Sequence, residues 1–319
     1  MTINNIRLGT RHSALAQAQA HRVGAMLQTA WPMLALETKT MTTVGDRNLE
    51  ASFRELVSQG HAGVFVKELE TSLLSRDIDL AVHSLKDMPS VQPQGLMMIP
   101  VGLRDDPRDA LILNPDSFPD TASLLSLPSG SRIGTASARR AALVSAVRKD
   151  LICLPVRGNL QTRLRKLSEG HFDGLLLAKA GFDRLPELSS QWRVVPCCPY
   201  HELMPAPAQG MLAVEFLENR DKVFSEMLAP LLPPLKTQLC IAAERAVLTG
   251  LSAGCHVALA VYAEFASEDA ESGTLNAVIH DNSTDKLYRV SQCFEPSFEA
   301  TLDAARAIVA QLKPYAPSA

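Results

Sequence analysis

Short apolar runs alternate with amphipathic stretches through the first hundred residues. The run Ile6–Gly9 predicts a buried strand, and Ser13 is a suitable cap for a helix that continues to about Thr29. Leu34–Met41 predicts a second strand, and Ile78–Val82 predicts a buried third strand after a further helical stripe. Strands separated by helices in this way favour a parallel α/β sheet.

A similar order of elements begins again near residue 132. Arg132–Ser137 leads into an amphipathic helix, as Leu8–Ser13 leads into the first one. Leu160–Leu164 followed by Phe172–Leu176 likewise resembles the earlier helical stripe and its strand. This internal similarity predicts two related α/β domains that face each other.

Proline-containing stretches mark the joints of the chain. Arg104–Arg108 and Met204–Pro207 have few periodic apolar positions, so we expect them to cross between the two domains. Pro233-Pro234 opens a third segment with helical patterns around Thr237–Leu248 and near Phe298–Leu312. Its strand-like runs are Val257–Phe265, Thr274–His280 and Tyr288–Phe294. We therefore predict domain 1 from residues 1–103 and 204–222, domain 2 from 104–203, and an α+β domain 3 from 223–319.

Composition narrows the class of protein. The 319 residues are 46% hydrophobic and 20% charged, which fits a soluble protein of two or three domains. With 31 basic and 34 acidic residues, the net charge of -3 gives no general attraction to nucleic acid or to an anionic membrane. No apolar run approaches the length of a membrane span and no signal-peptide core is evident, so we expect a cytoplasmic protein. The six cysteines lack disulfide or zinc-like spacing, so we expect neither disulfides nor a metal.

Arginines stand close to several predicted helix starts: Arg11, Arg139, Arg140, Arg157 and Arg163. A cation at a helix amino terminus is disfavoured, because the exposed N–H groups already make that end positive. A bound anion reverses the sign, since the N–H groups and the guanidinium then act together. The pattern predicts sockets for a ligand with several carboxylates or phosphates, acting on the ligand more than on folding. Surface salt bridges are the alternative for any single arginine.

The segment His83–Asp87 follows a buried strand, at the edge where open α/β sheets bind ligands. Asp87 could accept a hydrogen bond from a ring N–H and stabilise a cationic intermediate, with Lys86 helping to keep it ionised. We interpret His83 as a hydrogen-bonded structural histidine. A capped turn with a salt bridge is the alternative for the whole segment.

Cys255 and a glycine-rich stretch are two further candidates. Cys255 follows Gly254 in a predicted loop, where glycine permits the close approach of a bulky group and His256 could favour the thiolate. An inert thiol is the alternative. Gly60–Gly63, together with the weakly patterned Asn48–Ser58, predicts either a mobile lid or an ordinary solvated loop.

Several separated segments together resemble the porphobilinogen deaminase family. They run collinearly from residue 6 to about residue 265: Gly9–Ala16, Phe65–Glu70, Ala81–Pro89, Asp106–Ala110, Gly134–Arg140, Arg157–Leu164, Ala208–Gly210 and Gly254-Cys255. The resemblance implies an α/β fold of two lobes like those of type II periplasmic binding proteins, followed by a small C-terminal α+β domain.

The resemblance also implies a site. One dipyrromethane cofactor per chain would be attached to Cys255 through a thioether, and Asp87 would be the catalytic carboxylate. The implied cofactor-binding residues are Ser84, Lys86, Asp87, Thr135, Ser137, Arg139, Arg140, Arg157 and Gly158, besides Cys255. The implied substrate-binding residues are Arg11, Ser13, Gln19, Arg157, Arg163 and Arg184. No metal would be required.

The implied reaction joins four porphobilinogen molecules head to tail, each losing ammonia, and releases hydroxymethylbilane for tetrapyrrole (haem) biosynthesis. Porphobilinogen would be the sole kind of partner, without nucleic acid or membrane, and we expect a monomer. Two alternatives stay open. One is a solute-binding or ligand-sensing module with the same two lobes, and the other is a paralogue that binds tetrapyrrole precursors without turnover.

This sequence departs from the family pattern at five positions: Val44 for arginine, Ala62 for lysine in the lid, Ala138 for leucine, and Ala208 and Ala253 for glycine. The two lost cations are expected to weaken lid or substrate interactions, and so to affect rate and chain elongation. The reaction class is expected to survive, because the aspartate, arginine and cysteine positions remain.

Overall fold

The computed structural model describes residues 4–41, 66–119, 122–200, 202–254 and 257–316. The chain divides into two compact units, one made of Met1–Arg104 with Met211–Pro234 and the other of Asp105–Gly210 with Leu235–Ala319. Among the described residues, no helix combines the length and the apolarity needed to cross a membrane. The two units are described separately.

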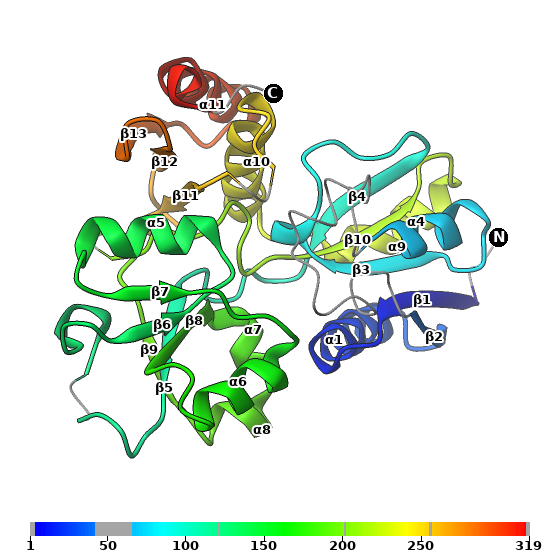
Figure 1. Ribbon diagram of the computed structural model, residues 1–319. Helices are drawn as coiled ribbons and strands as arrows, with labels where there is room; N and C mark the ends of the chain where they lie inside the picture. Colours follow the sequence, from blue (N-terminus) through cyan, green and yellow to red (C-terminus); the bar gives the residue numbers. More distant parts are fainter. Residues whose placement is uncertain (1–3, 42–65, 120–121, 201, 255–256, 317–319) are drawn as a thin grey trace. The chain divides into compact units, whose positions relative to one another are not determined.

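The first unit is built on a five-stranded sheet in the order β2-β1-β3-β10-β4 (Figure 1). β1 is parallel to its neighbours β2 and β3, whereas β10 is antiparallel to β3 and β4. The strands are β1 (Asn5–Arg11), β2 (Ala35–Met41), β3 (Leu80–Ser84), β4 (Leu96–Val101) and β10 (Leu212–Leu217). The predicted strands of this half are therefore confirmed, and β10, which follows the second lobe in the sequence, pairs with β3 and β4.

Helices cover both faces of this sheet: α1 (Ala14–Ala30), α4 (Lys67–Leu74) and α9 (Lys222–Leu228), with short 3₁₀ turns at η1 (Leu85–Asp87) and η3 (Ala229–Leu231). Val82 of β3 packs in one core with Val23 of α1 and Phe224 of α9. Ala81, which points to the opposite face, packs with Leu69 of α4. α9 was expected in domain 3, because the predicted boundary lay at residue 222. Its burial in the core of the first unit moves that boundary towards Pro234.

The second unit contains a sheet of the same design in the order β7-β6-β8-β5-β9. β6 is parallel to β7 and β8, and β5 is antiparallel to β8 and β9. The strands are β5 (Asp109–Leu113), β6 (Arg132–Gly134), β7 (Ile152–Leu154), β8 (Gly174–Ala178) and β9 (Arg193–Pro196). Its helices are η2 (Leu124–Ser126), α5 (Ala138–Val147), α6 (Leu160–Ser168), α7 (Lys179–Asp183) and α8 (Pro186–Ser189). Order and strand direction match the first sheet, which confirms two related α/β lobes.

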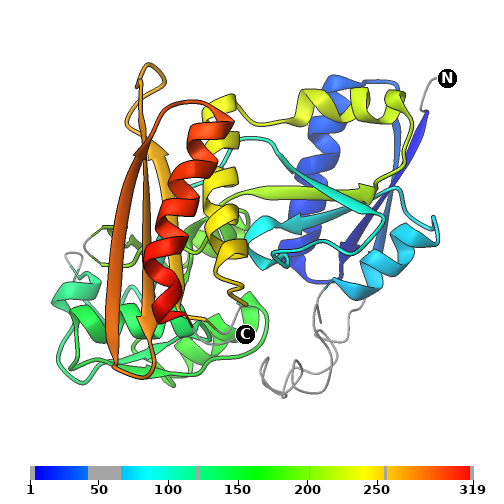
Figure 2. The same ribbon diagram turned by 90° about the horizontal axis from the view of Figure 1, so that it is seen from above.

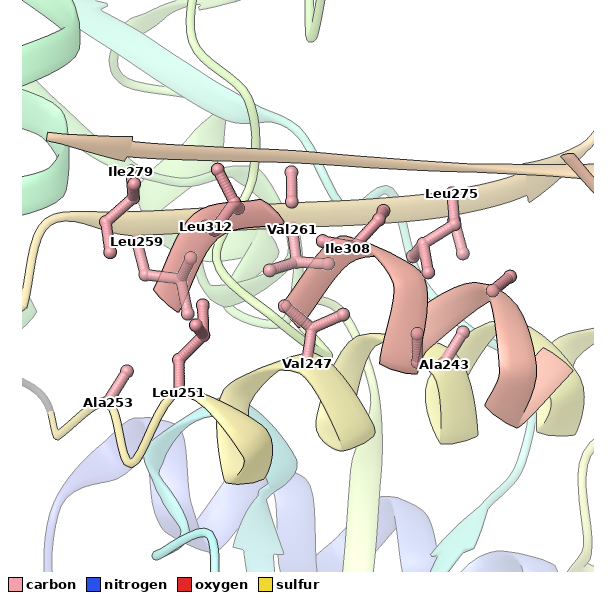
Figure 3. Packing of buried hydrophobic residues seen from close by; sticks show 14 of the residues in the cluster. Ala243, Val247, Leu251, Ala253, Leu259, Val261, Leu275, Ile279, Ile308 and Leu312 are labelled. Atoms are coloured by element: carbon pink, nitrogen blue, oxygen red, sulfur yellow. The ribbon is translucent and has the colours of Figure 1, made fainter. Parts of the chain in front are cut away.

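The remainder of the second unit is the expected α+β domain. An antiparallel sheet of β11 (Leu259–Phe265), β12 (Gly273–Asp281) and β13 (Lys286–Phe294) is covered on one face by α10 (Leu235–Gly250) and α11 (Phe298–Leu312), which lie side by side (Figure 2). A 3₁₀ turn, η4 (Lys313–Tyr315), follows α11. Val247, Ile308, Val261 and Ile279 meet in the core between helices and sheet (Figure 3). The other face of this sheet packs on the second lobe, where Ala260 shares a core with residues of that lobe.

Candidate functional site

The predicted catalytic segment lies where β3 ends. The chain leaves the strand at Ser84 and turns through η1, whose first residue, Leu85, is buried and donates its N–H to the Met211 carbonyl at 3.0 Å. Lys86 is half-buried and Asp87 is exposed. A largely buried strand therefore leads to the exposed Asp87 carboxylate beyond its carboxyl end, where a ligand can reach it.

The other predicted residues of the first lobe gather near the same edge. Arg11 ends β1, which lies parallel to β3. Gln19 of α1 is buried and donates from Nε2 to Ser84 Oγ at 2.7 Å, so the structure brings these two residues together. Ser13 caps α1 as expected, because its Oγ accepts the Ala16 N–H at 3.3 Å.

His83, which we interpret from the sequence as a structural histidine, lies on the opposite face of β3 and belongs to a buried set of ionisable side chains. His83 Nε2 lies 3.0 Å from Glu215 Oε2 of β10, and both side chains are almost fully buried. Glu70 of α4 interacts electrostatically with Glu215. Burial, then Glu215, raise the pKa of Glu70 to about 7, against the opposing effect of Lys67. Glu215 is the single charge in the apolar run Leu212–Leu217, and this contrast is the signal that could have revealed it.

In the second lobe, Arg139 and Arg140 share one buried carboxylate, Asp109 of β5. Arg139 donates from Nη1 to Asp109 Oδ2 at 2.7 Å and from Nη2 to Oδ1 at 3.2 Å. Arg140 donates to Oδ1 from Nε at 3.0 Å and from Nη2 at 2.8 Å. Burial alone would raise the pKa of Asp109, but the two guanidinium groups outweigh it and hold that pKa well below its usual range. We refer to these three residues as the Asp109 cluster.

The Asp109 cluster brings two positive charges and one negative charge to the start of α5. Ser137 caps this helix, accepting the Arg140 N–H at Oγ (3.4 Å), so the helix end adds further positive potential. Thr135, almost fully buried, stands between β6 and this cap. The excess of positive charge at a helix amino terminus suits an anionic group of a ligand. Asp109 lies in a motif of the family resemblance, but no role was predicted for it.

Arg157 and Gly158 form the neighbouring loop between β7 and α6. Arg157 is half-buried beyond the carboxyl end of β7, which lies parallel to β6. Gly158 adopts a φ of 105°, and a Cβ there would lie 2.6 Å from the Thr162 side chain, so the turn requires glycine. Arg163 donates from Nε to the Gly158 carbonyl at 2.8 Å, which ties the predicted substrate arginine to this loop.

Arg184 lies elsewhere in the second unit. Its side chain is largely buried and donates from Nε to Asp105 Oδ2 at 2.9 Å and from Nη2 to the Gly210 carbonyl at 2.8 Å. Asp105 belongs to the stretch Arg104–Arg108 predicted to cross between the lobes, and Gly210 lies three residues after the other predicted stretch, Met204–Pro207. Arg184 thus joins Asp105 to Gly210, and its role towards substrate stays a prediction.

Several predicted features fall outside the described residues. They are Cys255 with His256, the departures Val44 and Ala62, and the candidate lid of Asn48–Ser58 with Gly60–Gly63. The helix that leads to Cys255 is described, and it ends at Gly250.

Sequence comparison with known proteins matches this chain to porphobilinogen deaminases over most of its length. The family model "Porphobilinogen deaminase, dipyromethane cofactor binding domain" matches residues 6–225, and "Porphobilinogen deaminase, C-terminal domain" matches residues 238–308. Relatives named porphobilinogen deaminase include that of Syntrophobacter fumaroxidans, 37% identical over 93% of this chain and 91% of the relative. That of Syntrophomonas wolfei is 38% identical over 97% and 96% of the two chains.

Solved structures give a more distant likeness. The effector-binding domain of BenM with benzoate has a TM-score of 0.43 and 12% identity, covering 72% of this chain and 91% of that one. The periplasmic VFT2 domain of Bordetella pertussis BvgS also has a TM-score of 0.43, with 13% identity over 72% and 86% of the chains. The sequence matches, which span most of the chain, are the stronger finding: the chain belongs to the porphobilinogen deaminase family.

Proposed function

We propose that this chain is a transferase that deaminates four porphobilinogen molecules and joins them head to tail on a covalent dipyrromethane primer, releasing hydroxymethylbilane. The observation that carries the proposal is the exposed Asp87 carboxylate at the end of a buried strand. It is supported by membership of the porphobilinogen deaminase family. Asp87 is the proposed catalytic residue.

The residues of the second lobe fit the cofactor's chemistry. Its acetate and propionate groups are anions, and the Asp109 cluster offers an excess of positive charge beside the capped start of α5. We assign the cofactor carboxylates to Thr135, Ser137, Arg139, Arg140, Arg157 and Gly158, with Ser84 and Lys86 from the first lobe, and the pyrrole N–H groups to Asp87. Cys255 would hold the group by a thioether. When bound, the dipyrromethane supplies the pyrrole carbon to which each new unit is joined.

The proposed role of Asp87 is electrostatic and acid–base. As ammonia leaves porphobilinogen, the electrons of the carbon–nitrogen bond depart with it, and positive charge spreads to the pyrrole nitrogen. A carboxylate that accepts the pyrrole N–H stabilises this charge where it develops. The same oxygen can take up and return a proton in the later steps. Arg11, Ser13, Gln19, Arg157, Arg163 and Arg184 are the proposed substrate-binding residues.

We assign the protein to the cytoplasm as a monomer. In support, Cys153, Cys197, Cys198, Cys240 and Cys293, the cysteines that the structure describes, are all free thiols, as a reducing compartment favours. Sedimentation of the purified protein tests the monomer.

Intact mass combined with turnover tests the function. Purified protein should carry a dipyrromethane adduct and consume porphobilinogen, Cys255→Ser should lose both, and Cys293→Ser, at an exposed cysteine of β13, should keep both. An undiminished adduct on the Cys255→Ser protein would refute the attachment site. An adduct without turnover would favour the non-catalytic paralogue, and neither adduct nor turnover would favour a solute-binding module.

A further inference from the structure

The segment 204–210 of the second unit is bonded to the Asp109 cluster. Gln209 is completely buried, and its Nε2 donates to Asp109 Oδ1 at 2.9 Å and to the Pro107 carbonyl at 2.7 Å. Arg139 adds a bond from Nη1 to the carbonyl that begins the segment, that of Met204, at 2.5 Å. The segment therefore supplies a donor to the Asp109 carboxylate, through Gln209, and an acceptor to Arg139, through the Met204 carbonyl.

The same segment is bonded to the α+β domain. Glu244 of α10 is completely buried, and its Oε2 accepts the Ala208 N–H at 2.6 Å while its Oε1 accepts the Ala263 N–H of β11 at 2.8 Å. Val261, also in β11, donates its N–H to the Pro205 carbonyl at 3.2 Å. One buried carboxylate thus joins a helix, a strand and the segment.

The backbone of the segment needs this support. Ala208 has a φ of 59°, in the left-handed region that favours glycine, so its conformation is maintained by its surroundings. Glu244, which fixes the Ala208 N–H, stands six residues before Gly250, where α10 ends and the chain continues to Cys255. The helix that leads to the cysteine and the arginines assigned to the cofactor are consequently tied to one strained segment.

We propose that Gln209 and Glu244 are positioning residues: through the segment 204–210 they set the Asp109 cluster relative to α10, and so fix where the arginines meet a group carried on Cys255. This inference rests on the proposed function. It follows from bonds within one compact unit, since all of these residues lie in the second unit. Neither residue need touch substrate or cofactor, because each acts through groups assigned to the cofactor.

Two near-isosteric variants separate positioning from simple stability. Gln209→Met keeps the length of the side chain but removes both donors. Glu244→Gln keeps the shape but leaves one acceptor oxygen for two backbone N–H groups, so the segment or β11 loses its bond. Both variants should keep the dipyrromethane adduct by intact mass. Their kcat should fall roughly tenfold or more, because small displacements of oriented groups cost rate steeply, while KM should stay within about threefold.

Val247→Ala is the matched control. Val247 is completely buried one turn after Glu244 in the same helix and packs in the α10–α11 core. The Val247→Ala variant should have a lower melting temperature but an unchanged kcat when it is assayed below that temperature. If Gln209→Met and Glu244→Gln lose stability but turn over like Val247→Ala, the positioning role is wrong. Should Glu244→Gln fail to fold, Gln209→Met alone decides. Wild-type protein without an adduct would instead refute the proposed function, and this inference with it.

Discussion

Arg140 places both Nε and Nη2 on a single oxygen of Asp109, at 3.0 and 2.8 Å, within a fully buried environment. A further bond runs from its Nη1 to the Leu176 carbonyl at 3.1 Å. From its place near a helix start, we expect this arginine to act on ligand carboxylates more than on folding. Its contacts also give it a structural role, because the buried Asp109 carboxylate needs the positive charge of its arginines to offset the loss of solvation.

Replacement of Arg140 by leucine should therefore affect both stability and activity. The change removes three charge-assisted or carbonyl bonds and leaves Asp109 with Arg139 and Gln209 as partners. We expect the free energy of unfolding to fall by about 1–3 kcal/mol, the typical cost of an under-satisfied buried polar group. Urea denaturation measures this, and porphobilinogen consumption should be largely lost in the folded protein.

Arg165→Leu supplies the comparison. Arg165 is exposed on α6 and lies 3.6 Å from Glu169 in a surface pair. Its loss should change the free energy of unfolding by less than about 0.5 kcal/mol. Equal stability of the two variants would show that the bonds of Arg140 to Asp109 contribute little to the folded state.

Local features of this fold were predictable because they depend on neighbours in the sequence. The predicted helix cap at Ser13 is confirmed, and the closing helix predicted near Phe298–Leu312 is observed with those bounds. The exposed position of Asp87 after a buried strand followed from the same kind of pattern.

Pairings between distant residues were not predictable in this way. Arg139 meets an aspartate 30 positions earlier, and Gln209 meets the same residue from 100 positions away. Nothing in the local pattern around Gln209 distinguishes a buried donor from a turn residue. The domain boundary at 222 failed for a related reason: α9 is attached to the first unit by packing of Phe224 and Leu228, which amphipathic spacing alone does not assign to a partner.

Ala208→Gly should stabilise the protein. Ala208 has a φ of 59°, which glycine adopts without the steric cost that a Cβ brings. Part of the gain is offset by the greater freedom of glycine in the unfolded chain, so we expect a net increase of about 0.5–1 kcal/mol in the free energy of unfolding. Ala206→Gly, at a residue outside the left-handed region, should be destabilising in the same urea titration. A loss of stability in Ala208→Gly would mean that the Cβ makes contacts worth more than the strain.

The pH dependence of stability should reveal Glu70. Burial and the nearby Glu215 raise its pKa to about 7 in the folded protein, against about 4.3 in an unfolded chain. The folded state thus binds the proton more tightly, and stability falls as the pH rises from about 4.5 to about 7. Other groups facing this site, His83, Glu215 and Lys67, are common to wild type and variant. Glu70→Gln removes one titration, so its melting temperature relative to wild type should be higher at pH 8 than at pH 5. An unchanged difference would place the Glu70 carboxylate in water.

Asp87 gives the sharpest test of the chemistry. An amide at this position keeps the shape of the side chain and can still accept a pyrrole N–H, but it loses the negative charge. Loss of such preorganised stabilisation costs about 10²–10³ in rate, so Asp87→Asn should turn over porphobilinogen at least about a hundredfold more slowly. Asp87→Glu should retain more activity, because its charge survives at a displaced position. Asp87 is exposed, so neither change should alter the melting temperature by much. Rates must be compared on protein whose intact mass includes the dipyrromethane adduct, because failure to assemble the cofactor would imitate a failure of catalysis. If adduct-bearing Asp87→Asn ran at nearly the wild-type rate, charge stabilisation by this carboxylate would be excluded, even with fold and substrate correctly assigned.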